Sequence, residues 1–139
     1  MKKSFRLFLL VVLSFYFSVL GYGNSSDTSP QSQALVLGQN DSGATVSLRQ
    51  NQIISVSLWG NGSTGYTWDV VPGAESILIQ QGNPEFVADS DLIGSGGTYK
   101  FTFKASVPGT ATLNIIYHRP FETGVAALQT FAITVTVGS

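Results

Sequence analysis

The sequence predicts an all-β fold, an immunoglobulin-like antiparallel β-sandwich of about seven or eight strands. Two observations predict it. Apolar and polar residues alternate with a period of two from Val46 onward, and clusters of Gly, Pro, Asn and Asp separate the alternating stretches. Such alternation indicates strands with one buried and one solvated face, as in antiparallel sheets. No segment after residue 23 shows the apolar stripe of an amphipathic helix.

Each alternating stretch predicts one strand. The clearest stretches are 54–58, 66–70, 99–104, 111–117 and 130–137. The dipeptides Pro72-Gly73 and Pro108-Gly109 predict turns between strands, because Pro presets φ and Gly accepts a positive φ. The chain has no Cys, so the domain must be held by its apolar core alone.

The N-terminus has the layout of a secretory signal peptide. Basic residues within 1–6 precede an apolar run over 7–20, and small residues at 21 and 23 suit cleavage after Gly23. A retained membrane anchor is the alternative, but the run is shorter than the roughly 20 residues that span a bilayer. We expect three parts: a signal peptide over 1–23, a disordered polar lead-in over 24–33 and a domain over 34–139. The domain would be exported, either to the periplasm or out of the cell.

Composition excludes several classes of function. Removal of residues 1–23 leaves four basic residues against eight carboxylates, a formal charge of −4. We therefore expect binding neither to nucleic acid nor to an anionic membrane surface. With no Cys and a single His, His118, the chain predicts no metal site, no cofactor and no Ser-His-Asp triad. The sequence favours a binding protein over an enzyme, with a monomer as the default state.

Three short segments between the alternating stretches are the candidate binding loops, because loops at one end of a sandwich can form a single binding edge. They are Asn61-Gly62-Ser63-Thr64-Gly65-Tyr66, Gly94-Ser95-Gly96-Gly97 and Arg119-Pro120-Phe121. Taken singly, each has an ordinary explanation. Asn-Gly is a strong hairpin signal, the glycines could serve only a flexible loop, and the phenylalanine could close the core.

Together, in this order and at this spacing, the segments resemble the loops of the chagasin-like inhibitors of papain-family cysteine peptidases. That family carries an Asn-Pro-Thr-Thr-Gly-aromatic loop, a Gly-x-Gly-Gly loop and an Arg-Pro-Trp/Phe loop on an immunoglobulin-type sandwich. The resemblance extends to the flanking strands and covers the chain from Val46 to Val137. Two positions depart from the pattern: Gly62 stands where the family commonly has Pro, and Ser63 where it commonly has Thr.

The resemblance implies a reversible, tight-binding, competitive inhibitor of a cathepsin L-like cysteine peptidase, with all residues of the three segments at the interface. Thr64 would approach the catalytic cysteine. The Gly94–Gly97 segment would hydrogen-bond along the non-primed side as an added strand, and Phe121 would anchor the primed side.

The leading alternative is an adhesion or carbohydrate-binding sandwich module of the cell surface. Such a module would use exposed aromatic side chains on a sheet face and would need no particular loop sequence. In that case Trp59 or Trp68 should face solvent, whereas the inhibitor hypothesis places Trp68 in the core.

Overall fold

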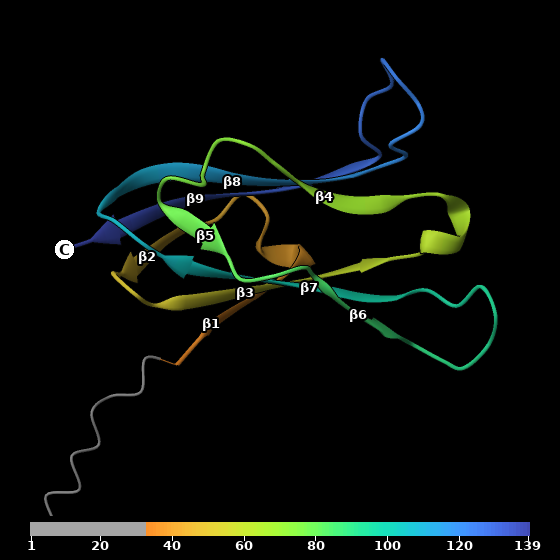
Figure 1. Cartoon of the computed structure of the whole chain (residues 1–139), viewed down its shortest axis with the longest axis horizontal. Coiled ribbons are helices and arrows are strands. Elements are labelled where there is room, and N and C mark those ends of the chain that lie inside the picture. Colours follow the sequence, from red (N-terminus) through yellow and green to blue (C-terminus); the bar gives the residue numbers. More distant parts are fainter. Residues whose placement is uncertain (1–32) are drawn as a thin grey trace, which may run out of the picture. The chain divides into compact units, whose positions relative to one another are not determined.

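The computed structural model describes residues 33–139, which form nine strands and two short 3₁₀ turns (Figure 1). The predicted all-β sandwich is confirmed, with nine strands where the sequence suggested seven or eight. The elements are β1 Leu35–Gly38, η1 Gln39–Asp41, β2 Thr45–Arg49, β3 Ile53–Gly60, η2 Gly62–Thr64, β4 Thr67–Val71, β5 Leu78–Gln80, β6 Glu85–Ala88, β7 Gly97–Ala105, β8 Gly109–His118 and β9 Gln129–Gly138.

The strands form two sheets. The first sheet has the order β1-β3-β7-β5, with β6 also paired to β7, and the second has the order β2-β9-β8-β4. The pairs in the middle of each sheet are antiparallel, as expected. At one edge of each sheet, however, the pairing is parallel, between β1 and β3 and between β2 and β9. The alternation pattern could not foresee this, because burial on one face is compatible with either direction.

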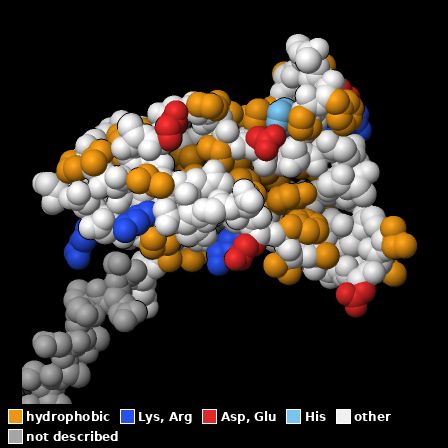
Figure 2. Space-filling model, in the orientation of Figure 1, with side chains coloured by type: hydrophobic (Ala, Val, Ile, Leu, Met, Phe, Trp, Pro, Cys, Tyr) orange, Lys and Arg blue, Asp and Glu red, His pale blue; other side chains and the backbone are white. Residues whose placement is uncertain are grey.

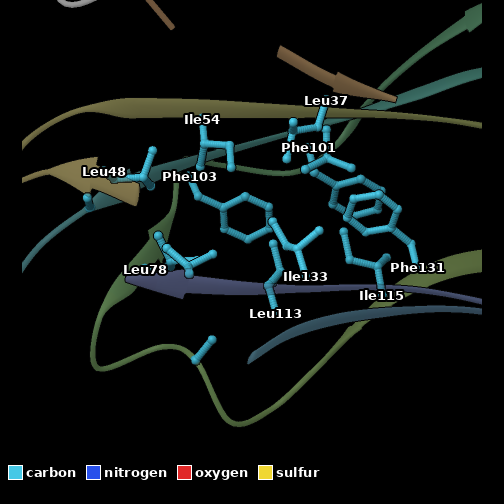
Figure 3. Packing of buried hydrophobic residues seen from close by; sticks show 14 of the residues in the cluster. Leu37, Leu48, Ile54, Leu78, Phe101, Phe103, Leu113, Ile115, Phe131 and Ile133 are labelled. Atoms are coloured by element: carbon cyan, nitrogen blue, oxygen red, sulfur yellow. The ribbon is translucent and has the colours of Figure 1, made fainter. Parts of the chain in front are cut away.

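The core lies between the two sheets and follows the predicted alternation (Figure 3). In β3, Ile54, Val56 and Leu58 are fully buried. Phe101 and Phe103 from β7 stack with ring centroids 6.5 Å apart. Aliphatic and aromatic side chains of the second sheet face them, namely Leu113, Ile115, Phe131 and Ile133. Each such side chain contributes about 1.5–3 kcal/mol of transfer free energy, which is how a domain without disulfides is held together.

Three connections gather at one end of the sandwich, opposite the C-terminus (Figure 1). They are the β3–β4 connection, which contains η2, the β6–β7 connection and the β8–β9 connection. Each contains one of the three segments singled out in the sequence, so the fold places those segments together.

The predicted signal peptide over 1–23 and nearly all of the predicted lead-in over 24–33 lie outside the described residues. Between residues 33 and 139, no helix has the length and apolar character needed to cross a membrane.

Candidate functional site

The first segment, Asn61 to Tyr66, carries the chain from the first sheet to the second. Its centre is the 3₁₀ turn η2, and Asn61 caps that turn: its side-chain oxygen accepts hydrogen bonds from the Ser63 N–H at 3.0 Å and the Ser63 hydroxyl at 2.6 Å. The Thr64 hydroxyl donates to the Asn61 carbonyl at 2.6 Å. Gly65 ends the turn with φ 83°, a left-handed conformation that favours glycine.

This geometry corrects the hairpin interpretation of Asn61-Gly62. β3 and β4 belong to different sheets, so no two-residue hairpin joins them. Asn61 has an extended backbone with φ −129°, and the positive φ falls on Gly65. The Asn side chain serves as a helix cap, which is the other common local role of this residue type.

The second segment begins in the β6–β7 connection and ends inside a strand. Gly94 has φ 82°. Gly97 is the first residue of β7 and pairs with Gly60 on one side and Ala88 on the other. A Cβ on Gly97 would approach the Ala88 Cα within 2.8 Å, so the glycine permits close pairing of the chain with itself.

The expectation that this whole segment offers free backbone to a partner is therefore wrong at Gly97. The Gly96 carbonyl is also engaged, accepting from the Asp89 N–H at 2.9 Å. The part that projects beyond these bonds is the tip of the loop, from Leu92 to Ser95.

The third segment follows β8. Phe121 is 71% exposed, so it does not close the core, which was the ordinary explanation for it. Its ring lies against Gly65, where a Cβ would come within 3.0 Å of the ring. The Arg119 guanidinium lies 4.4 Å from the centre of the Tyr66 ring and forms an ion pair with Glu122 at 3.0 Å. Pro120, between Arg119 and Phe121 in the sequence, is exposed.

Direct contacts join the three segments. The Asn61 side-chain amide donates to the Gly94 carbonyl at 3.0 Å, which links the first segment to the second. The Arg119 Nε donates to the Thr64 carbonyl at 3.1 Å, which links the first segment to the third. The first segment is therefore held from both sides, and residues more than 50 positions apart form one continuous edge.

Aromatic side chains support this edge from below. Tyr66 stacks on Tyr117 with ring centroids 5.1 Å apart, and Trp68 packs against the same Tyr117 ring with centroids 4.9 Å apart. The hydroxyl of Tyr117 accepts a hydrogen bond from the Asn61 N–H at 2.8 Å. The backbone of the first segment thus gives the Tyr117 hydroxyl a hydrogen-bond partner, while the ring itself lies in the core.

Sequence reasoning missed four exposed apolar side chains beside these segments. Leu92 is 78% exposed and Ile93 fully exposed at the tip of the β6–β7 loop, while Val125 and Leu128 are exposed in the β8–β9 connection. Figure 2 shows hydrophobic side chains on both loops that project at this end. The available signal was an apolar pair between Asp91 and Gly94, where no strand periodicity explains it.

The exposure of the two tryptophans was expected to separate the inhibitor hypothesis from the adhesion alternative, and the two side chains differ. Trp68 is 2% exposed and belongs to the core, as the inhibitor hypothesis requires. Trp59 is 49% exposed on the outer face of the first sheet, as the alternative requires. Its indole N–H, however, donates to the Asp89 carboxylate at 2.8 Å, so the ring is already engaged by the protein itself.

No grouping of side chains suited to metal binding occurs in the part of the chain that the structure describes. His118 contacts Asp69 at 2.7 Å on the partly exposed outer face of the second sheet. Across residues 33–139, no three His, Cys, Asp or Glu side chains are grouped closely enough to hold an ion.

Comparison with known proteins identifies relatives of this chain. The sequence pattern of the family described as chagasin family peptidase inhibitor I42 matches residues 47–135. Chagasin from Trypanosoma cruzi is 32% identical over 84 residues, which cover 57% of this chain and 76% of chagasin.

Solved structures share the fold. The cysteine protease inhibitor EhICP2 from Entamoeba histolytica has a TM-score of 0.68 at 24% identity, over 76% of this chain and 96% of that one. PbICP-C, solved in complex with falcipain-2, has a TM-score of 0.54 at 21% identity, over 77% of this chain and 92% of that one. The family is one of inhibitors and not of enzymes. The chain belongs to the chagasin family of peptidase inhibitors, I42.

Proposed function

We propose that this protein is a reversible, tight-binding, competitive inhibitor of papain-family cysteine peptidases of the cathepsin L type. The proposal is that the edge formed by the three segments enters and covers the active-site cleft. The observation that carries it is the double link of the first segment, through Asn61 to Gly94 and through Arg119 to Thr64. The partner class is supported by the chagasin and EhICP2 matches, and by the complex of PbICP-C with falcipain-2.

The conformation of η2 favours inhibition over cleavage. Peptide substrates bind to a partner in extended form, as an added strand. Residues Gly62 to Thr64 instead form a 3₁₀ turn whose last carbonyl is held by Arg119. A peptidase that meets this turn finds no extended peptide bond, so the loop can occupy the cleft without being cut.

The exposed side chains of the outer two loops would extend the contact. Phe121, Val125 and Leu128 would lie on one side of η2, and Leu92 and Ile93 on the other. A clamp of this kind buries on the order of 1,600 Å² in total. Its tightness would come mainly from the fixed arrangement of the loops, because few side chains must be ordered on binding.

We further propose that the domain acts after export, either in the periplasm or outside the cell. Support comes from the order of basic, apolar and small residues over 1–23.

The decisive experiment is a titration of residues 24–139 against papain and a cathepsin L-type enzyme, with a fluorogenic peptide as substrate. We expect stoichiometric inhibition. The apparent KM for the substrate should rise while kcat stays unchanged, and peptidase activity should be recovered on dilution. Thr64→Ala and Phe121→Ala should weaken it, whereas Ile79→Ala, an exposed change on β5, should not. A folded domain that fails to inhibit at micromolar concentration would refute the proposal.

A further inference from the structure

Trp59 is a large aromatic side chain placed outside the core. It lies near the end of β3 and pairs with Thr98 of β7, which in turn pairs with Val87 of β6. Its side chain is on the outer face of the first sheet and is 49% exposed. Packing of the sandwich interior therefore does not account for it.

The indole lies on the neck of the β6–β7 loop. The ring covers Gly96 so closely that a Cβ at this position would come within 2.9 Å of Cε2 of Trp59. The indole N–H donates to the Asp89 carboxylate at 2.8 Å. Asp89 and Gly96 are the two ends of the loop, and they are joined to each other by the Asp89 N–H bond to the Gly96 carbonyl at 2.9 Å. One side chain thus touches both sides of the neck.

The backbone of Trp59 is itself tied to the core. Its carbonyl accepts a hydrogen bond from the indole N–H of buried Trp68 at 3.0 Å. Two residues beyond Trp59, the Asn61 side chain reaches the Gly94 carbonyl at the far end of the same loop. Trp59 therefore holds the loop at its neck, and Asn61 holds it near its tip.

We propose that Trp59 is a positioning residue, which clamps the 89–96 loop to β3 and so keeps Gly94 within reach of Asn61. Its effect on inhibition rests on the function proposed above. Trp59 acts through the loop and does not contact the peptidase. The half-exposed ring, which an adhesion module would use as a platform, is in close contact with this protein's own Gly96.

The consequence is a loop that is ordered before binding. Without the indole, the neck would retain only the backbone bond between Asp89 and Gly96 and the bond from the Ser90 N–H to the Ser95 hydroxyl. The tip at Leu92 and Ile93 would then sample more conformations. Ordering them on association lowers affinity, and we expect the inhibition constant to rise about tenfold on loss of the ring.

The test is a double-mutant cycle with Trp59→Ala, Gly96→Ala and the double variant. The first readout is amide hydrogen exchange in the free inhibitor, and the second is the inhibition constant. Trp59→Ala should speed exchange at the amides of 89–95 about tenfold or more and leave β8 and β9 unchanged. Gly96→Ala should have a similar effect, because its Cβ displaces the ring. The double variant should be no worse than either single one, since both remove the same contact.

Two further variants separate the components of the clamp. Trp59→Phe keeps a ring over Gly96 but lacks the N–H donor to Asp89, so its effect should lie between wild type and Trp59→Ala. It also keeps the test valid if Trp59→Ala folds poorly. Val36→Ala removes an exposed apolar side chain from β1 of the same sheet and should change neither readout.

Two results would overturn the proposal. The first is unchanged loop exchange in Trp59→Ala, and weaker inhibition in that case would mean that Trp59 contacts the peptidase directly. The second is additivity of the two single changes. If the wild type inhibits no peptidase, the proposed function fails, but the exchange data still decide whether Trp59 positions the loop.

Discussion

Gly62→Pro is the most informative single substitution in the central loop. Gly62 is the first residue of η2, the position at which Pro is most favoured in a helical turn, and its φ is not positive. The preceding Asn61 has φ −129° and ψ 98°, an extended conformation of the kind that a following Pro requires. The backbone is thus already arranged for Pro.

The magnitude follows from two opposing terms. Fixing φ at Gly62 removes conformational freedom worth about 0.5–1 kcal/mol, which corresponds to about a two- to fivefold change in an equilibrium constant. Against this, a Cβ at Gly62 would lie 3.0 Å from the Tyr99 hydroxyl, so that ring must move by a few tenths of an ångström. We expect an inhibition constant that is unchanged or a few-fold tighter in the wild-type background. In a Tyr99→Phe background, where the hydroxyl is absent, we expect the full gain.

The assay is a titration of papain with the four proteins of this cycle, together with urea unfolding of each. Tyr99→Phe alone is the control, and it should leave the inhibition constant within about twofold of wild type, since it alters no loop backbone. An inhibition constant that is tenfold higher for Gly62→Pro in both backgrounds would refute the reasoning, because it would show that the loop follows another path at residues 61–62.

Three other predictions follow from the contacts. Asn61→Asp keeps the oxygen that caps η2 but replaces the donor to the Gly94 carbonyl with a repelling oxygen, so the inhibition constant should rise about tenfold with little loss of stability. Gly97→Ala collides with the Val87 carbonyl across the β6–β7 pair and should cost about 1–3 kcal/mol in urea unfolding. Burial raises the pKa of Tyr99, so the folded state keeps that proton longer than the unfolded chain. Stability should therefore fall as pH rises from about 10 through the higher folded pKa, and Tyr99→Phe should flatten this decline.

Gly97→Ala has a matched control in another glycine of the same sheet. Gly38→Ala places a Cβ 3.9 Å from its nearest neighbour at an ordinary φ of −117°, so its unfolding curve should match wild type. If it is as destabilised as Gly97→Ala, the loss at 97 reflects glycine replacement in general and not the collision. Inhibition by Asn61→Asp that equals wild type would show that the bond to Gly94 contributes nothing to the arrangement of the loops.

Much of the fold could be predicted because the long strands alternate. In β3, β7, β8 and β9 the buried apolar side chains recur at every second position along most of the strand, and each strand was evident from the sequence. Ser55 of β3 is buried as well, which the alternation did not predict. The short strands β5 and β6 were not. All four residues of β6 are exposed, and the strand exists because β7 offers it an edge, which is a tertiary cause without a local signal.

The site shows the same division. The three segments were found because glycine, proline and an Asn interrupt the alternation. Their mutual contacts could not be derived, because the Asn61 to Gly94 bond joins residues 33 positions apart and depends on how the sheets pack. Local propensity also misassigned Asn61-Gly62 to a hairpin. Whether the next strand joins the same sheet or the opposite one is decided by the whole fold and not by the turn.

The design of this end of the molecule couples the stability of the core to the rigidity of the loops. Tyr117 and Trp68 bury their rings, yet each places its polar atom on the loop-bearing chain, at the Asn61 N–H and at the Trp59 carbonyl. A buried Tyr or Trp needs such a partner, so the folding energy of the core also fixes where the loops begin. Ordering that would otherwise be required on binding is thereby completed on folding. At the far end of the sandwich, Leu48 and Leu78 are equally buried but support no projecting loop, so changes there should affect stability alone.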